Sequence, residues 1–168
     1  MEKKNHALLQ PVINKVLVTV ALIISCSQSH AFCFAEAASV YQVNELVLRA
    51  IAQHESRMNP GLRLVNSNGS IDFGLMGVNS IHLSPDEPLS RAGMTREMLL
   101  DPCTNVMTGA YLLRRKISKF GNTWTAIGAY HSTKDVHNAN YQLRIWRTLQ
   151  GMLRQASLPS ELAAVTTE

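Results

Sequence analysis

The chain has 168 residues, with 16 lysine and arginine residues against 12 aspartate and glutamate residues, which gives a formal net charge of +4. This length suffices for one domain with a substantial core. From Phe32 onward, 13 basic and 11 acidic residues leave a net charge of only +2. So small an excess does not predict binding to nucleic acid, although it suits the surface of an anionic polymer.

The first 31 residues have the features of a secretory signal peptide. A basic segment precedes the apolar run 16–24, and Ser29-His30-Ala31 follows as a small-residue cleavage site. The apolar run is far shorter than the roughly 20 residues that a membrane span needs. We therefore expect export to the periplasm. In an alternative reading, Ile23-Ile24-Ser25-Cys26 resembles a bacterial lipobox, and a lipid on Cys26 would tether the domain to a membrane.

The cysteines agree with export. Cleavage after Ala31 would discard Cys26 and leave Cys33 and Cys103. In an oxidising compartment such a pair favours a disulfide, which would stabilise the fold by about 3–4 kcal/mol by restricting the unfolded chain. The alternative is two separate buried thiols.

The first helix of the mature chain is predicted after Asn44, a typical N-cap residue. It should end within a few residues of Glu55, because Pro60 restricts the preceding residue to extended conformations. One face of this helix is expected to carry an apolar stripe formed by Leu46, Val47, Ala50 and Ile51.

Glu55 follows Ile51 by one turn on the same helix face. Partial burial and the negative end of the helix dipole would both raise the pKa of this carboxyl, and a raised pKa suits a proton donor. The alternative is a surface carboxylate at a frayed helix end, paired with Arg57 or Arg49.

Segment 61–80 reads as loop and turn. Asn68-Gly69 between Val65 and Ile71 predicts a small hairpin. Gly74 and Gly77 indicate unusual backbone dihedrals or close approach of a ligand. A polar loop and a short helix over 94–100 are expected next.

Three further helices are predicted in the second half. The first begins at Asp101-Pro102 and ends at Gly121. Thr123 can cap the second, and Asn138 or Asn140 the third. Their predicted core-facing residues are Cys103, Val106, Ala110, Leu113, Ile117, Trp124, Ile127, Tyr130, Tyr141, Ile145, Leu149 and Met152. The predicted fold class is mostly α, an α+β domain over 32–153 with five or six helices, a small β-hairpin-like excursion and a weakly ordered tail over 154–168.

Several kinds of chemistry are not supported by any motif. His54-Glu55 is no zinc motif, because position 58 is Met rather than the required second histidine. A glycine-rich phosphate loop and a recognisable Ser-His-Asp series are both missing from the sequence. The remaining histidines read as surface or supporting residues: His82, His131 and His137. We expect no metal and no cofactor.

Amide side chains suited to sugar hydroxyl or N-acetyl groups are Asn66, Asn68, Asn79 and Asn105, although Asn68 is better explained as a turn former. Three ordered motifs then carry a specific resemblance: Glu55-Ser56, the segment 74–79 (GLMGVN), and Ala129-Tyr130-His131. Together with segments 68–74 and 101–113, they resemble lytic transglycosylases with a goose-lysozyme-like fold. The most similar group is the small exported enzymes of type III and type IV secretion, conjugation and pilus machines, and the likeness spans about residues 33–146.

The resemblance implies cleavage of the β-1,4 bond between N-acetylmuramic acid and N-acetylglucosamine in the glycan strands of peptidoglycan, with a 1,6-anhydro product. Glu55 would act first as acid and then as base. Tyr130 would reach Glu55 or the N-acetyl group, and Ser56 would fix the turn beneath Glu55. The implied substrate-binding residues are Ser56, Asn66, Met76, Gly77, Asn79 and Tyr130. We interpret Asp72 as a structural loop carboxylate.

One position departs from the family pattern, which usually has Gln where this chain has Gly77. Loss of that amide predicts weaker substrate binding, at roughly 0.5–1.5 kcal/mol for each lost hydrogen bond. Two alternatives therefore remain: a muramidase of the same fold that uses water, and a non-catalytic peptidoglycan-binding module of a secretion machine.

Overall fold

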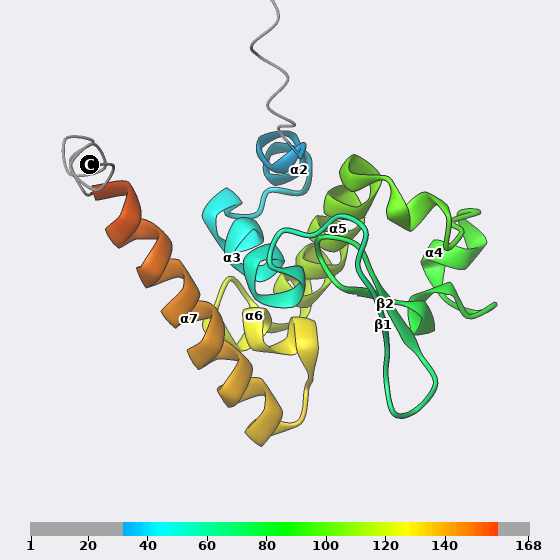
Figure 1. Ribbon diagram of the computed structural model, residues 1–168. Helices are drawn as coiled ribbons and strands as arrows, with labels where there is room; N and C mark the ends of the chain where they lie inside the picture. The colour runs from blue at the N-terminus through cyan, green and yellow to red at the C-terminus, as the bar shows by residue number, and fades with distance from the viewer. Residues whose placement is uncertain (1–31, 158–168) are drawn as a thin grey trace, which may run out of the picture. The chain divides into compact units, whose positions relative to one another are not determined.

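The structure is a computed structural model that describes residues 32–157. The predicted signal peptide, Cys26 and the last eleven residues (158–168) lie outside the described residues. The elements are α2 (Phe34–Tyr41), α3 (Glu45–Ser56), β1 (Arg63–Val65), β2 (Ile71–Phe73), β3 (Val78–Asn79), η1 (Ser80–Leu83), α4 (Pro88–Arg91), η2 (Met98–Leu100), α5 (Pro102–Phe120), α6 (Trp124–His131) and α7 (Asp135–Ser157). The mostly α class with a small β element is confirmed (Figure 1). None of these described helices combines the length and apolar character needed to cross a membrane.

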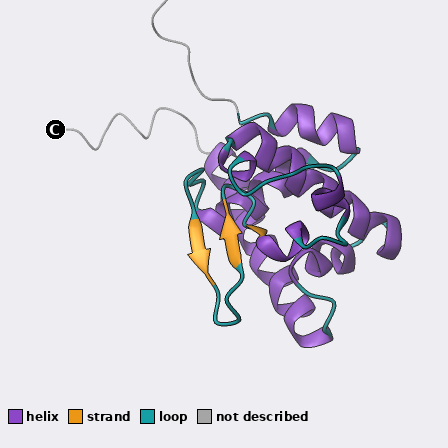
Figure 2. Cartoon of the chain, turned by 90° about the vertical axis from the view of Figure 1, so that its right-hand side faces the viewer, coloured by secondary structure: helices purple, strands orange, loops and turns teal. Residues whose placement is uncertain are grey.

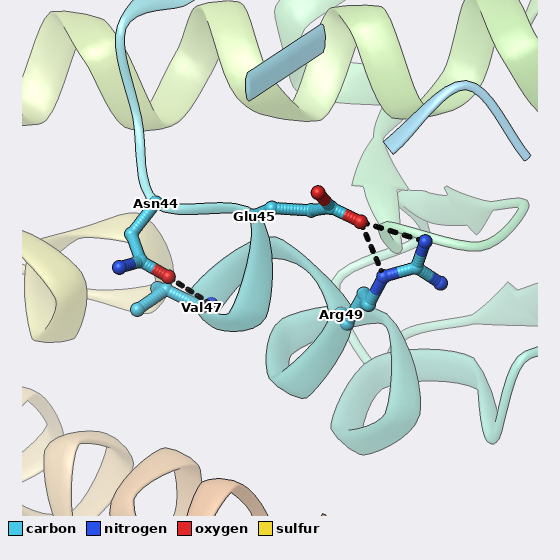
Figure 3. A network of polar contacts seen from close by, with 4 residues as sticks. All are labelled: Asn44, Glu45, Val47 and Arg49. Carbon is cyan, nitrogen blue, oxygen red and sulfur yellow. Dashed lines mark hydrogen bonds and ion pairs between the residues drawn. The ribbon is translucent and has the colours of Figure 1, made fainter. Parts of the chain in front are cut away.

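Helix α3 begins where the sequence predicts. The side chain of Asn44 accepts a hydrogen bond of 3.2 Å from the backbone N–H of Val47, which caps the first turn (Figure 3). Beside this cap, Arg49 donates from Nε to Glu45 Oε1 at 2.8 Å (Figure 3). Arg49 is therefore engaged by Glu45 at the other end of the helix rather than by Glu55.

The buried face of α3 is rotated from the predicted one. Leu46 was expected to face the core, but it is 44% exposed, whereas Leu48 is fully buried. The predicted burial of Ala50 and Ile51 is confirmed. Leu48, Ile51 and Ala52 form a buried stripe at the i, i+3, i+4 spacing of one helix face. Glu55 continues this stripe at i+7, so the expected placement of the carboxylate at the end of an apolar face holds.

The hairpin is confirmed. Strands β1 and β2 pair antiparallel with Val65 opposite Ile71, and β3 adds a third antiparallel strand beside β2. The side chain of Asn68 accepts a hydrogen bond of 3.0 Å from the N–H of Ser70, as expected for a turn former. Figure 2 shows the two longer strands side by side at the edge of the helical part.

The predicted limits of α5 are also confirmed. The Asp101 side chain accepts from the N–H of Thr104 at 2.7 Å, and Gly121 ends the helix with a φ of 73°. The disulfide between Cys33 and Cys103 joins the residue before α2 to the first turn of α5, as predicted, across 70 residues of sequence.

Four expectations about elements differ from the structure. The short helix expected over 94–100 is reduced to the three residues of η2, and helix α2 was not predicted. Asn138 and Asn140 do not cap the last helix, since α7 begins earlier, at Asp135. Asn138 instead donates to the carbonyls of Thr125 and Ser132, at 3.1 and 3.0 Å, and so ties α7 to α6. Helix α7 also continues four residues beyond the expected domain end at 153.

Helices α5, α6 and α7 pack against one another in sequence, and α7 also packs along α3 (Figure 1). The Asn105 side chain, which we expected to be available to a sugar, is fully buried in this core. It donates to the carbonyls of Phe73 and Leu99 and accepts from the N–H of Met76 at 2.7 Å. Asn105 therefore fixes the segment that follows β2 onto α5.

Candidate active site

A cleft of about 950 Å³ separates the hairpin from the helices α3, α6 and α7. Its hairpin side carries small polar residues, among them Asn66, Asp72 and Asn79. Its helical side includes Glu55 and Tyr141. The sequence-predicted acid thus lies in a cleft with the amide side chains that were expected to bind sugar.

Glu55 is held by a residue that the sequence did not assign to the site. The hydroxyl of Tyr141 donates a hydrogen bond of 2.5 Å to Glu55 Oε1. Tyr141 was predicted as a core residue of the last helix, and it is indeed buried, with 3% of its surface exposed. Because its hydroxyl reaches the cleft, the same side chain serves the core and the site.

The pKa of Glu55 is raised to about 6, mainly because burial disfavours the charged carboxylate. The hydrogen bond from Tyr141 opposes this shift, and the negative charge of Asp72 adds to it. The rise agrees with the prediction made from the position of Glu55 on its helix. At neutral pH a useful fraction of this group is still protonated, as a general acid requires.

Tyr130 does not make the predicted contact with Glu55. Its hydroxyl donates to the backbone carbonyl of Met76 at 2.9 Å and so ties α6 to the segment between β2 and β3. Burial raises the pKa of Tyr130 well above its ordinary value, so this residue remains a neutral hydrogen-bond donor. Tyr130 also lines the cleft.

Two of the predicted substrate-binding residues lie beneath the cleft surface. The Met76 side chain is fully buried against α5. The contact is so close that a Cβ added at Gly109 of α5 would lie 2.6 Å from Met76 Cγ. Ser56 is buried as well, where its hydroxyl donates to the carbonyl of Ala52 and accepts from the N–H of Asn59. This is the turn-fixing contact that we expected of Ser56.

Asp72 organises the hairpin side of the cleft. Its two carboxylate oxygens accept hydrogen bonds from the amides of Asn79 and Asn66, at 2.6 and 3.0 Å. Ser70 Oγ accepts from the same two amides. The carbonyl oxygen of the Asn79 side chain is used by the N–H of Ile81. This network fixes both predicted sugar-binding amides, which supports the structural interpretation of Asp72.

Gly77 lies directly against the acid. A Cβ at this position would lie 3.1 Å from Glu55 Oε2 and 3.1 Å from Glu55 Cβ. Its φ of +57° falls in the left-handed region, which glutamine rarely adopts. The glycine therefore does more than omit an amide, because it leaves one face of the carboxylate open to the cleft.

Among the described residues, only Cys33, Glu36 and Cys103 are grouped closely enough to suggest a metal site. Both cysteines are consumed by the disulfide, so a single carboxylate remains available to an ion. This grouping therefore does not form a metal site.

The family described as Transglycosylase SLT domain matches residues 32–144. The chain belongs to this family. The match covers the cleft from α3 to Arg144 of α7, and it agrees with the resemblance predicted from the three ordered motifs.

Three named relatives share between 34% and 40% sequence identity with this SLT domain protein. Invasion protein IagB of Salmonella typhimurium is 34% identical over 143 residues, which covers 80% of this chain and 88% of the relative. Protein IpgF of Shigella flexneri is 37% identical over 103 residues, covering 61% of this chain and 66% of the relative. The X polypeptide of Escherichia coli is 40% identical over 101 residues, covering 60% and 58%.

Proposed function

We propose that this SLT domain protein is a peptidoglycan lytic transglycosylase that cleaves the bond between N-acetylmuramic acid and N-acetylglucosamine and forms 1,6-anhydro-N-acetylmuramic acid. The observation that carries this proposal is the position of Glu55, a carboxyl with a raised pKa that opens into a polar cleft. An intramolecular nucleophile, the 6-hydroxyl of the sugar, needs no second carboxylate from the protein.

In this mechanism protonated Glu55 gives its proton to the oxygen that leaves the anomeric carbon. The resulting carboxylate then takes the proton of the 6-hydroxyl as that oxygen attacks the same carbon. Tyr141 favours the carboxylate form by donating to Oε1, and the open face beside Gly77 leaves Oε2 accessible. Burial has the opposite effect on charge, so the two influences keep the pKa of Glu55 near the pH at which it must both lose and regain a proton.

The same protein would act on peptidoglycan strands in the periplasm, after export, in support of a secretion, conjugation or pilus machine. The signal-like sequence over residues 1–31 and the disulfide support export. A relative of this chain carries the name Invasion protein IagB, which supports a role of the proposed activity in invasion.

A second candidate is hydrolysis by a water molecule, because Asp72 shares the cleft and its charge acts on Glu55. Two carboxylates flanking a glycosidic bond are the usual arrangement for such hydrolysis. The hydrogen bonds from Asn66 and Asn79 favour the structural role for Asp72 instead.

Digestion of purified sacculi tests these assignments with the wild-type protein, Glu55→Gln and Asp72→Asn. We expect the wild type to release soluble muropeptides and Glu55→Gln to release less than about one-hundredth as much, as is typical of losing an acid–base group. Asp72→Asn should retain anhydro products at a reduced rate, because only the position of two amides changes. If the wild type binds sacculi but releases nothing, the protein is a non-catalytic module.

A further inference from the structure

The helical wall of the cleft has a different chemical character from the hairpin wall. The cleft-lining residues contributed by α7 and the residue before it are Lys134, His137, Asn140, Tyr141 and Arg144. Residues 134, 137, 141 and 144 follow one another at steps of three or four, and residue 140 lies one turn from 137 and 144, so all five share one helix face. We call this face the cationic stripe. Since Tyr141 on this face donates to Glu55, the stripe runs past the predicted acid.

Two cations on this stripe, Lys134 and Arg144, form no ion pair among the described residues. The ion pairs within residues 32–157 involve Arg49 with Glu45, and His82 and Arg115 with Glu87. In that part of the chain, neither Lys134 nor Arg144 has an acidic partner within salt-bridge distance. The wall therefore presents two free cationic groups to whatever occupies the cleft.

The opposite wall offers mainly hydrogen bonds, and its one charged group, the Asp72 carboxylate, is negative. Hairpin residues that line it carry amides and hydroxyls, including Asn66, Asn68 and Ser70. The carboxylate of Asp72 on this side is already engaged by two amide groups. A ligand that fits both walls would present hydroxyl or N-acetyl groups along one edge and negative charge along the other.

Two histidines fix the stripe next to the acid. The ring of His131 stacks on Tyr141 with ring centroids 5.1 Å apart, and His54 meets the same ring edge-on at 5.4 Å. Burial is the main cause that lowers the pKa of His54 and of His131, so these two rings add little positive charge at neutral pH beside Lys134 and Arg144. The stacking holds the helix face that bears these two cations against the cleft.

Resting on the function proposed above, we propose that the Lys134–Arg144 face of α7 is a subsite for carboxylates carried on the lactyl side of muramic acid. In a peptidoglycan strand this edge carries either a peptide stem with free carboxylates or, where the stem has been removed, the bare lactyl carboxylate. The other edge carries the sugar hydroxyl and N-acetyl groups that suit the hairpin wall. The two walls together would orient the strand so that its lactyl edge faces α7.

Binding measurements in the Glu55→Gln background test this subsite without turnover. The variant Lys134→Gln/Arg144→Gln is compared with a matched control, Arg147→Gln/Arg154→Gln, which removes two exposed cations of α7 outside the cleft. At pH 7 the cleft variant should bind stem-bearing glycan oligosaccharides about fivefold or more weakly, as expected for losing two charge-assisted contacts. The control should stay within about twofold, and thermal unfolding should show both variants folded.

Three further probes identify the source of the carboxylate. If the loss disappears with oligosaccharides whose stem carboxylates have been amidated, the stems are the ligand. If it persists with stem-free glycan, the lactyl carboxylate is the ligand. An equal loss with chitin oligomers, which have neither group, would overturn the subsite. Equal binding by the cleft variant and the control would overturn it as well, while the proposed function would stand. If the Glu55→Gln protein binds none of these polymers, the proposed function and the subsite both fail.

Discussion

Tyr141 donates a hydrogen bond to Glu55 across 86 residues of sequence, from the buried face of α7 to the last turn of α3. Burial raises the pKa of the Glu55 carboxyl, while this hydrogen bond lowers it by favouring the charged form. The protonation of the predicted acid therefore depends on how α7 packs against α3.

Replacing Tyr141 with Phe should shift the pH dependence of activity. The variant loses a donor to the carboxylate, so the pKa of Glu55 should rise and the alkaline fall in kcat/KM should move to higher pH. The maximal rate should also drop about tenfold, since one hydrogen bond to a charged group is lost. A pH profile of muropeptide release from sacculi measures both effects.

Tyr130→Phe is the matched control for that experiment. The Tyr130 hydroxyl donates to the Met76 carbonyl and not to Glu55. This variant should therefore lose about 1 kcal/mol of stability, and the alkaline fall in its kcat/KM should stay at the wild-type pH. An unshifted profile for Tyr141→Phe, or an equal shift for both variants, would argue against the specific role of Tyr141.

Local sequence signals predicted much of this fold. Asn44, Asp101 and Thr123 each cap the helix that follows them, because a cap requires only a side chain and a backbone N–H three residues away. The disulfide between Cys33 and Cys103 was predicted from the number of cysteines together with the expected export of the chain. These features depend on near neighbours in the chain or on residue counts.

The contacts that were missed depend on tertiary packing. Both Tyr130 and Tyr141 were read as inward-facing, and periodicity alone cannot show which hydroxyl reaches Glu55. Asn138 was predicted as a helix cap, but it lies inside α7 and faces α6. The two helices are so close there that a Cβ at Gly128 of α6 would lie 2.2 Å from the Asn138 side-chain oxygen. Asn138 therefore joins α7 to α6, a role that its residue type did not indicate.

Replacing Glu55 with Gln should stabilise the protein at neutral pH. The folded-state pKa of about 6 lies above the ordinary value of 4.5, so the folded protein binds this proton more tightly than the unfolded chain does. The contribution of Glu55 to the free energy of unfolding is fully present below pH 4.5 and is lost as the pH rises through about 6. The loss amounts to about 2 kcal/mol. Urea unfolding should thus show Glu55→Gln more stable than wild type at pH 7 and equal to it near pH 4. Glu36→Gln, on an exposed part of α2, is the control for removing one carboxylate.

Gly77→Ala should change the acid as well as the backbone. Alanine at a φ of +57° costs about 1 kcal/mol, and its methyl group would lie 3.1 Å from Glu55 Oε2 and exclude water there. The pKa of Glu55 should rise further, which moves the alkaline fall in activity to higher pH. The rate at every pH should nevertheless drop, because the methyl group covers the Oε2 face that the substrate must reach. The bulkier Gly77→Gln should behave similarly rather than restore a lost contact.

Gly93→Ala separates backbone strain from the effect on Glu55. Gly93 has a φ of +79° with open space around it, so this variant should show the same loss of stability and an unchanged pH profile. A gain of activity in Gly77→Gln would show instead that substrate binding by the glutamine amide usual in the family outweighs the backbone strain at position 77.

Removing the disulfide should cost most of the domain's stability. The bond closes a loop of 70 residues, for which the chain-entropy treatment gives about 4 kcal/mol. Urea unfolding of Cys33→Ser/Cys103→Ser should show a correspondingly lower unfolding free energy, and a reducing agent should destabilise the wild type alone. A change below about 1 kcal/mol would mean that the unfolded chain is already restricted without the bond.

Digestion of sacculi in water enriched in ¹⁸O, with the products analysed by mass, distinguishes intramolecular attack assisted by Glu55 from hydrolysis. We expect the wild-type protein to give 1,6-anhydro ends that carry no ¹⁸O, and Glu55→Gln to give almost no product. Reducing muramic acid ends labelled with ¹⁸O would contradict intramolecular attack and assign the cleft to hydrolysis.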